Sequence, residues 1–167
     1  MDKLDDFGID RFITLQETLA YHFRNKKLLT EAFTHPTFAY EFHQESISGN
    51  QRLEFLGDSI LGMVAAEYVY KEYADFSEGE LTRRRSLLVN KDHLANKAKE
   101  MGLSQYLLLG KGEAKSGGGK NRTNLSGALE AIIGAIYIDG GIEEAKKFII
   151  QKLFIKKQEK DMEEIGE

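Results

Sequence analysis

The feature that most constrains the fold is the stretch from Asn50 to about Tyr73, which contains no proline. Its apolar residues recur every three or four positions, the period of one face of an α-helix. They are Leu53, Leu56, Ile60, Leu61, Val64, Ala65 and Tyr68. Asn50 is also a residue type that commonly caps a helix N-terminus. We therefore predict one long, core-forming helix over this stretch.

Composition extends the helical prediction to the whole chain. The 167 residues include 1 proline, and Leu, Ala, Glu and Lys, which keep most of their rotamer freedom in a helix, are abundant. Ser77 followed by Glu80 has the pattern of a capping box. The expected fold class is all-α, with further helices at about 15–23, 25–35, in two segments between 77 and 102, at 125–140 and at 142–154.

Two segments are predicted to be loops. They are about Thr37–Gly49 and "LGKGEAKSGGGKNRTN" at 109–124, which is rich in glycine and lysine. The second does not fit the frame of a phosphate-binding loop, so no nucleotide cofactor is expected. We expect one domain over residues 1–155 and a charged tail, or the start of a linker, over 156–167.

Cysteine usage and hydropathy exclude several classes of protein. The chain has no cysteine, which excludes disulfides, thiolate chemistry and zinc fingers and fits a reducing compartment. The longest apolar stretches are too short to span a membrane. We therefore expect a cytoplasmic protein that makes no membrane contact.

Three carboxylates occupy positions that a helical core does not usually provide. Glu54 and Asp58 are four residues apart, so they share one face of the predicted long helix and repel each other. Gln51 lies one turn earlier on that face. Far along the chain, Glu130 lies in an apolar segment where an unpaired charge is costly. The arrangement is reasonable on a wet face, or where a divalent cation neutralises it.

Oxygen donors without cysteine or a matching pair of histidines suit Mg²⁺ or Mn²⁺ better than zinc. The chemistry that such an ion supports is attack of water on a phosphodiester, because it activates water and stabilises charge on the attacking and leaving oxygens. On spacing alone, ordinary surface carboxylates remain an alternative.

The motif "QRLEFLGDSILG" closely resembles the signature of the ribonuclease III family. The similarity continues, in the family's order and spacing, through "LLTEAFTHPTFA", "EGELTRRRSLLVNKDHLANKAKEMGL", "LLLGKGEAKSGG" and "LEAIIGAIYIDGG". It extends from about Leu15 to Phe154.

The resemblance implies a helical endonuclease domain that forms a homodimer and cuts double-stranded RNA with Mg²⁺, for which Mn²⁺ can substitute. It implies 5′-phosphate and 3′-hydroxyl ends with short 3′ overhangs, and a role in rRNA and mRNA maturation. Glu54, Asp58 and Glu130 match the family's metal-binding acids, with Asp58 and Glu130 as catalytic residues. Phe55 matches an aromatic residue that inserts into the partner subunit.

Two positions depart from the family pattern. Gln51 stands where the family usually has glutamate, and Gly127 stands where it usually has aspartate. Each change removes one anionic donor, although the Gln51 amide oxygen can still accept a hydrogen bond from a water. The alternative is a weak or inactive helical dimer that binds structured RNA. A plain helical interaction protein is a third interpretation, which the length of the match disfavours.

Basic residues are unevenly distributed in a chain whose net charge is −4. The candidates for phosphate contacts are Lys111, Lys115, Lys120 and Arg122, with Arg83–Arg85 as a second group. An acidic domain of this kind should bind RNA weakly, because few cations replace the counterions of the phosphates. Bacterial members usually continue into a double-stranded-RNA-binding domain, and we expect no such domain in this chain.

Overall fold

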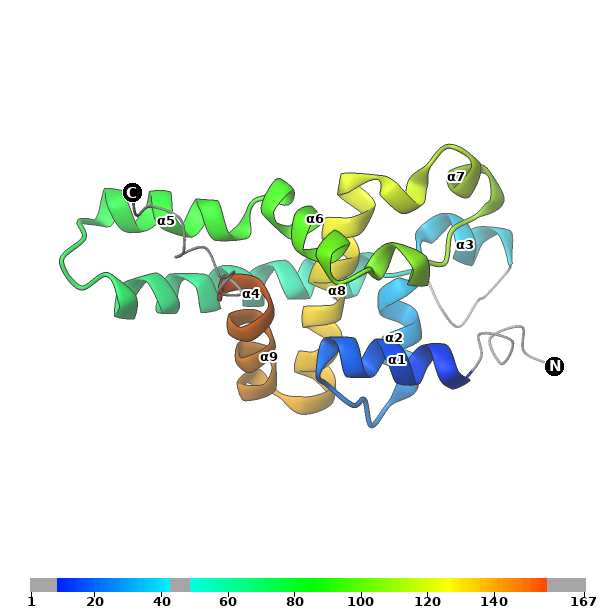
Figure 1. Cartoon of the computed structure of the whole chain (residues 1–167), viewed down its shortest axis with the longest axis horizontal. Coiled ribbons are helices and arrows are strands. Elements are labelled where there is room, and N and C mark those ends of the chain that lie inside the picture. The colour runs from blue at the N-terminus through cyan, green and yellow to red at the C-terminus, as the bar shows by residue number, and fades with distance from the viewer. Residues whose placement is uncertain (1–8, 43–48, 156–167) are drawn as a thin grey trace, which may run out of the picture.

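The computed structural model describes residues 9–42 and 49–155 (Figure 1). The predicted all-α class is confirmed there, and the only extended pairing in these ranges is a parallel bridge between Thr34 and Leu108. The elements are α1 (Ile9–Leu19), α2 (Lys26–Phe33), α3 (Pro36–Glu41), α4 (Gln51–Glu72), α5 (Glu78–Val89), α6 (Lys91–Glu100), η1 (Leu103–Tyr106), α7 (Lys111–Lys115), η2 (Gly118–Lys120), α8 (Arg122–Gly140), α9 (Ile142–Ile149) and the π-helical turn η3 (Ile150–Phe154). The predicted tail, 156–167, lies outside the described residues.

Helices α4 and α8 cross at the centre of the domain (Figure 1). Their backbones touch, because glycines stand at the crossing. A Cβ atom on Gly57 would lie 1.7 Å from the carbonyl oxygen of Glu130, and one on Gly134 would lie 2.4 Å from the carbonyl oxygen of Leu53. The crossing therefore brings Glu130 against the segment of α4 that carries the other two acids.

The remaining helices complete a core around α8. Helices α2, α6 and α9 pack directly on it, and its fully buried side chains include Leu129, Ile132, Ile133 and Ile136. Helix α5 differs, because none of its residues is buried against the described part of the chain. It lies alongside the C-terminal half of α4 and projects from the body of the domain (Figure 1). No helix within the described ranges is both long enough and apolar enough to cross a lipid bilayer.

The predicted capping box is confirmed, and Asn50 is the N-cap residue of α4 as predicted, although its side chain does not cap the helix. The Ser77 hydroxyl accepts from the Glu80 backbone, and the Glu80 carboxylate accepts from the Ser77 backbone. Asn50 makes no side-chain cap. Its amide instead donates to the Ala32 carbonyl oxygen at 3.1 Å, and its backbone N–H donates to Thr34 O at 2.8 Å. Asn50 therefore fastens the start of α4 to the end of α2.

The two predicted loops contain short helices. In the first, Pro36 begins α3, a position where its missing N–H has no cost, and the His35 side chain caps it. In the second, the structure forms α7 and η2. The second segment is fastened to α3, because the Glu41 carboxylate accepts from the Lys111 backbone N–H at 2.9 Å. Hydrogen bonds from the backbone of one segment to side chains of the other stabilise the two segments, and local sequence patterns do not reveal such bonds.

Candidate metal centre

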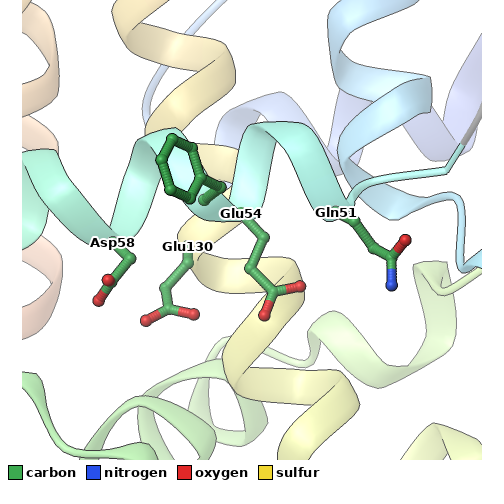
Figure 2. A pocket seen from close by; sticks show the side chains of 5 residues that line it. Gln51, Glu54, Asp58 and Glu130 are labelled. Atoms are coloured by element: carbon green, nitrogen blue, oxygen red, sulfur yellow. The ribbon is translucent and has the colours of Figure 1, made fainter.

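The three predicted acids line one open pocket. Helix α4 contributes Glu54 and Asp58, and α8 contributes Glu130. The pocket has a volume of about 250 Å³, and Gln51 and Phe55 complete its lining. Figure 2 shows the three carboxylates pointing to the same side of the crossing, with Gln51 at one end of the row. The structure thus brings together residues that are far apart in the sequence.

Charge crowding is greatest at Glu130. Burial raises the pKa of its carboxyl to about 7, assisted by the charges of Asp58 and Glu54 and by a hydrogen bond with Asp58, while Lys91 opposes the shift. Burial also raises the pKa of Glu54, as does the charge of Asp58, and His35 acts in the opposite direction. The pocket is therefore electronegative, and Glu130 exchanges its proton near neutral pH.

This shift predicts that the metal-free fold loses stability as the pH rises. The folded protein keeps the Glu130 proton up to a pKa of about 7, whereas an unfolded glutamate releases it near 4.5. The stabilisation from proton binding is therefore complete below pH 4.5 and is lost as pH rises through about 7. We expect Glu130→Gln to melt above the wild type in EDTA by a larger margin at pH 8 than at pH 5. Equal margins at the two pH values would contradict the shift.

The donor chemistry fits a hard divalent cation. Carboxylate oxygens and one amide oxygen line the pocket, and these are ligands that Mg²⁺ and Mn²⁺ prefer. Within residues 9–42 and 49–155, however, no three or more His, Cys, Asp or Glu side chains are arranged to hold an ion as they stand. Binding an ion therefore requires the acidic side chains to rotate toward a common point.

Both positions that depart from the family pattern belong to this site. Gln51 is exposed at the first residue of α4 and lines the pocket. Gly127 is buried in α8, and a Cβ atom on it would lie 2.9 Å from Oε2 of Glu54. The effect of Gly127 on metal binding stays a prediction.

The predicted phosphate contacts differ in availability. Lys111, Lys115 and Lys120 are exposed on α7 and η2. Arg122, at the start of α8, instead binds Asp92 at 2.8 Å and Asn96 at 3.2 Å. In the second group, Arg84 stacks on the Tyr73 ring and donates to its hydroxyl at 3.0 Å. Within each group the exposed residues without these contacts, Lys111, Lys115 and Lys120 and then Arg83 and Arg85, remain the candidates for phosphate contacts.

Phe55 is 78% exposed at the rim of the pocket, so it is not a core residue of the single chain. Two pocket neighbours were not among the predicted site residues. His35 caps α3, and its charge acts to lower the pKa of Glu54. Lys91, the first residue of α6, acts to lower the pKa of Glu130, and no sequence pattern indicates that it lies near the acids.

Comparison with known proteins assigns the family. A sequence model of the family described as Ribonuclease-III-like matches residues 25–157. The chain belongs to the ribonuclease III family. Ribonuclease 3 of Syntrophomonas wolfei is 49% identical over 131 residues, which cover 78% of this chain and 55% of that protein. In this protein and in two further ribonuclease 3 relatives, the matched region covers 55% to 66% of the relative's own length. The chain thus spans between just over half and about two thirds of the length of these relatives.

Two solved structures agree with this ribonuclease III assignment. The nuclease domain of ribonuclease III from Campylobacter jejuni has a TM-score of 0.79 at 37% identity, covering 89% of this chain and 99% of that one. A second structure of that domain has a TM-score of 0.77 at 39% identity, covering 84% and 96%, and is described as flexible in a region involved in dimer formation. The described chain therefore has the fold of a ribonuclease III nuclease domain.

Proposed function

We propose that this domain is a Mg²⁺-dependent endoribonuclease that hydrolyses double-stranded RNA, with Mn²⁺ as a possible substitute. The observation that supports this best is the placement of Glu130 beside Glu54 and Asp58 in one open, electronegative pocket. Family membership points the same way, since ribonuclease III enzymes generally depend on Mg²⁺. We place the activity in cytoplasmic RNA processing, including rRNA and mRNA maturation.

Glu54, Asp58 and Glu130 would hold the ion through their carboxylate oxygens. A bound divalent ion supplies activation of water and stabilisation of charge on the reacting phosphate. Glu130 must first release the proton that its pKa of about 7 retains. Gln51 can orient a water, because its amide oxygen accepts a hydrogen bond. Attack of water on phosphorus breaks the bond to the 3′ oxygen, which leaves as a hydroxyl and gives a 5′-phosphate end.

Duplex RNA is the substrate that fits the surface chemistry. A-form RNA is recognised largely by shape and backbone contacts, and exposed Lys111, Lys115 and Lys120 supply positive charge for its phosphates. Since the net charge of the chain is −4, binding should be weak and should decrease steeply with salt.

We further propose that the domain is a homodimer joined at Phe55, so that two pockets cut the two strands and leave short 3′ overhangs. A phenylalanine that is 78% exposed leaves apolar area that a second copy would bury. The exposed Met63 and Tyr70 on the same helix extend this apolar surface.

Phe55→Glu is expected to weaken the dimer by roughly 100-fold or more. Burying one phenylalanine contributes about 1.5–3 kcal/mol, and a two-fold interface contains the residue twice. Tyr40→Glu is the matched control, because Tyr40 is an aromatic residue that is 84% exposed on α3. Sedimentation velocity at micromolar concentration measures both variants. A Phe55→Glu protein that sediments like the wild type would exclude Phe55 from the interface.

Incubation with a perfect RNA duplex at low salt, with and without Mg²⁺, tests the proposed activity. We expect cleavage only with the ion, and products with 5′ phosphates and short 3′ overhangs. Gln51 and Gly127, which carry no carboxylate, favour one alternative: a weak or inactive dimer that binds structured RNA. Duplex binding without cleavage at high protein concentration would select that alternative.

A further inference from the structure

Helix α3 has no residue that is buried by the described part of the chain, yet its side chains hold the backbone of another segment. The Thr37 hydroxyl accepts a hydrogen bond from the Gly110 backbone N–H at 3.0 Å. The Glu41 carboxylate accepts one from the Lys111 backbone N–H at 2.9 Å. Figure 1 shows α3 and α7 next to each other at one end of the domain. Helix α3 therefore supports the segment that starts at Gly110.

These two bonds satisfy backbone donors that α7 cannot satisfy by itself. The N–H groups in the first turn of a helix have no partner within the helix, and Gly110, the N-cap of α7, has no side chain that could accept from them. Gly110 is also buried, where an unpaired N–H is costly. With 5 residues, α7 is too short to be stable without such support.

The packing of α3 on Gly110 leaves this segment little freedom to move. A Cβ atom on Gly110 would lie 2.6 Å from Oε1 of Glu41 and 2.9 Å from Cβ of Thr37. The far end of the segment is held as well, because the Asn124 amide donates to the Gly118 carbonyl oxygen at 3.1 Å. The segment between these contacts carries the exposed lysines and is fixed at both ends.

The residues just before α3 also hold the start of α4, which carries the pocket. The His35 backbone N–H donates to Leu108 O at 2.9 Å, and Thr34 O accepts from the Asn50 backbone N–H at 2.8 Å. Asn50 immediately precedes Gln51, which lines the pocket. The lysines of α7 and η2 are thus held in a fixed relation to the candidate metal centre.

Glu41 places a negative charge beside a segment that is proposed to contact phosphates. Its side chain is exposed, and within residues 9–42 and 49–155 it forms no ion pair. Charge alone would make Glu41 oppose RNA binding, because a carboxylate repels phosphates. Its hydrogen bond to the Lys111 backbone has the opposite effect, since it fixes the helix that carries the positive charges.

We propose that Thr37 and Glu41 are positioning residues for RNA binding, which hold α7 so that its lysines meet the phosphates of a duplex bound at the pocket. The inference rests on the proposed function, because it takes duplex RNA as the ligand. It assigns to an acidic side chain a favourable effect on the binding of an anion. An interpretation from charge alone predicts the reverse, namely that removing Glu41 strengthens binding.

The deciding experiment measures binding of a short, fluorescently labelled RNA duplex by anisotropy in EDTA, so that cleavage does not interfere. We expect Glu41→Ala to bind about 5-fold more weakly than the wild type. The slope of log affinity against log salt should become shallower by about 1, the effect of one lost phosphate contact. Glu41→Gln should bind at least as tightly as the wild type, because its amide oxygen still accepts the Lys111 N–H and its charge is gone.

Glu143→Ala is the control for these variants, because Glu143 is an exposed glutamate on α9 and makes no contact with α7. Its RNA affinity should equal that of the wild type. Binding by Glu41→Ala that is as tight as binding by Glu41→Gln overturns the proposal.

Thr37 provides an independent test of the same support. Thr37→Val keeps the shape of the side chain but leaves the Gly110 N–H without its partner, so RNA binding should weaken by about the same factor. Thr37→Ser keeps the hydroxyl and should bind like the wild type. Thr18→Val is the control, because the Thr18 hydroxyl binds the Thr14 carbonyl oxygen of its own helix at 2.9 Å. Equal affinities of Thr37→Val and Thr37→Ser would show that the hydroxyl does not position α7.

Two further readouts separate positioning from a general loss of structure. The Lys111 amide should exchange its hydrogen faster in Glu41→Ala but not in Glu41→Gln, with no change at the buried residues of α8. In cleavage assays with Mg²⁺, Glu41→Ala should raise KM and change kcat little, because it leaves the pocket residues in place. A lower kcat at an unchanged KM would contradict a role in RNA binding.

The inference and the proposed function can fail separately. If the wild type binds the duplex but does not cut it, the proposed activity is wrong and the binding titrations still decide the role of Thr37 and Glu41. If the wild type cuts RNA and Glu41→Ala binds it like Glu41→Gln, the positioning role alone is wrong. Absence of duplex binding by the wild type at low salt overturns both.

Discussion

Gly57→Ala is expected to destabilise the domain severely. The added Cβ atom would lie 1.7 Å from the carbonyl oxygen of Glu130 and 2.6 Å from its carbonyl carbon. Ordinary overpacking costs about 1–3 kcal/mol, because side chains can adjust. Here both contacting groups are backbone, so α4 and α8 must move apart along their crossing. We expect a loss of roughly 4 kcal/mol or more, a large part of the 5–15 kcal/mol by which domains are usually stable.

Gly62→Ala provides the control for this substitution. Gly62 lies in the same helix, and a Cβ atom there would meet no described atom within 4 Å. Alanine should therefore stabilise the helix by up to about 1 kcal/mol, since glycine loses more backbone entropy on folding. Urea unfolding followed by circular dichroism compares the variants. If Gly57→Ala unfolds at the wild-type urea concentration, α4 and α8 do not approach each other as closely as described.

Glu130→Gln is expected to reduce cleavage of duplex RNA by roughly 1,000-fold while preserving the fold. The substitution keeps the shape of the side chain and removes its charge. A metal ion contributes several kcal/mol of charge stabilisation, and each 1.4 kcal/mol corresponds to a factor of ten in rate. Loss of one anionic ligand from a set of three should remove much of that contribution.

Single-turnover cleavage at saturating Mg²⁺ measures this effect, with Glu143→Gln as the control. Glu143 is an exposed glutamate in the first turn of α9 and does not line the pocket. We expect wild-type rates from the control and a well-folded protein from both variants. Cleavage by Glu130→Gln within a few-fold of the wild type would remove Glu130 from the catalytic set.

Much of the helical framework follows from local sequence. The long helix at 51–72 was predicted from the spacing of its apolar residues, and the Ser77 capping box from the identity of two side chains. The errors occur where distant segments decide the structure. Asn50 is the N-cap residue of α4 as predicted, but its side-chain amide donates to the Ala32 carbonyl oxygen and makes no capping bond. Helix α3 forms in a predicted loop, and its Glu41 holds the segment that begins at Lys111.

The candidate site was predictable only in part. Helical spacing places Glu54 and Asp58 on one face, but no local rule joins them to Glu130. The family motifs supplied that connection in advance, and the crossing of α4 and α8 gives it a physical basis. The position of the Glu54 carboxylate beside Gly127 depends on one rotamer in a packed interface. Neither spacing nor a motif records such a contact.

The glycine crossing also limits how this site could be adapted to another ion. In most helix pairs, larger or smaller side chains at the contact adjust the interaxial distance. Gly57 and Gly134 have no side chain whose size could change this distance, because their backbones already touch the opposite helix. Ligand spacing can then change only through the length of the acids themselves, as in Glu54→Asp. Evolution or design toward a larger cation would have to act on side-chain reach, with the framework fixed.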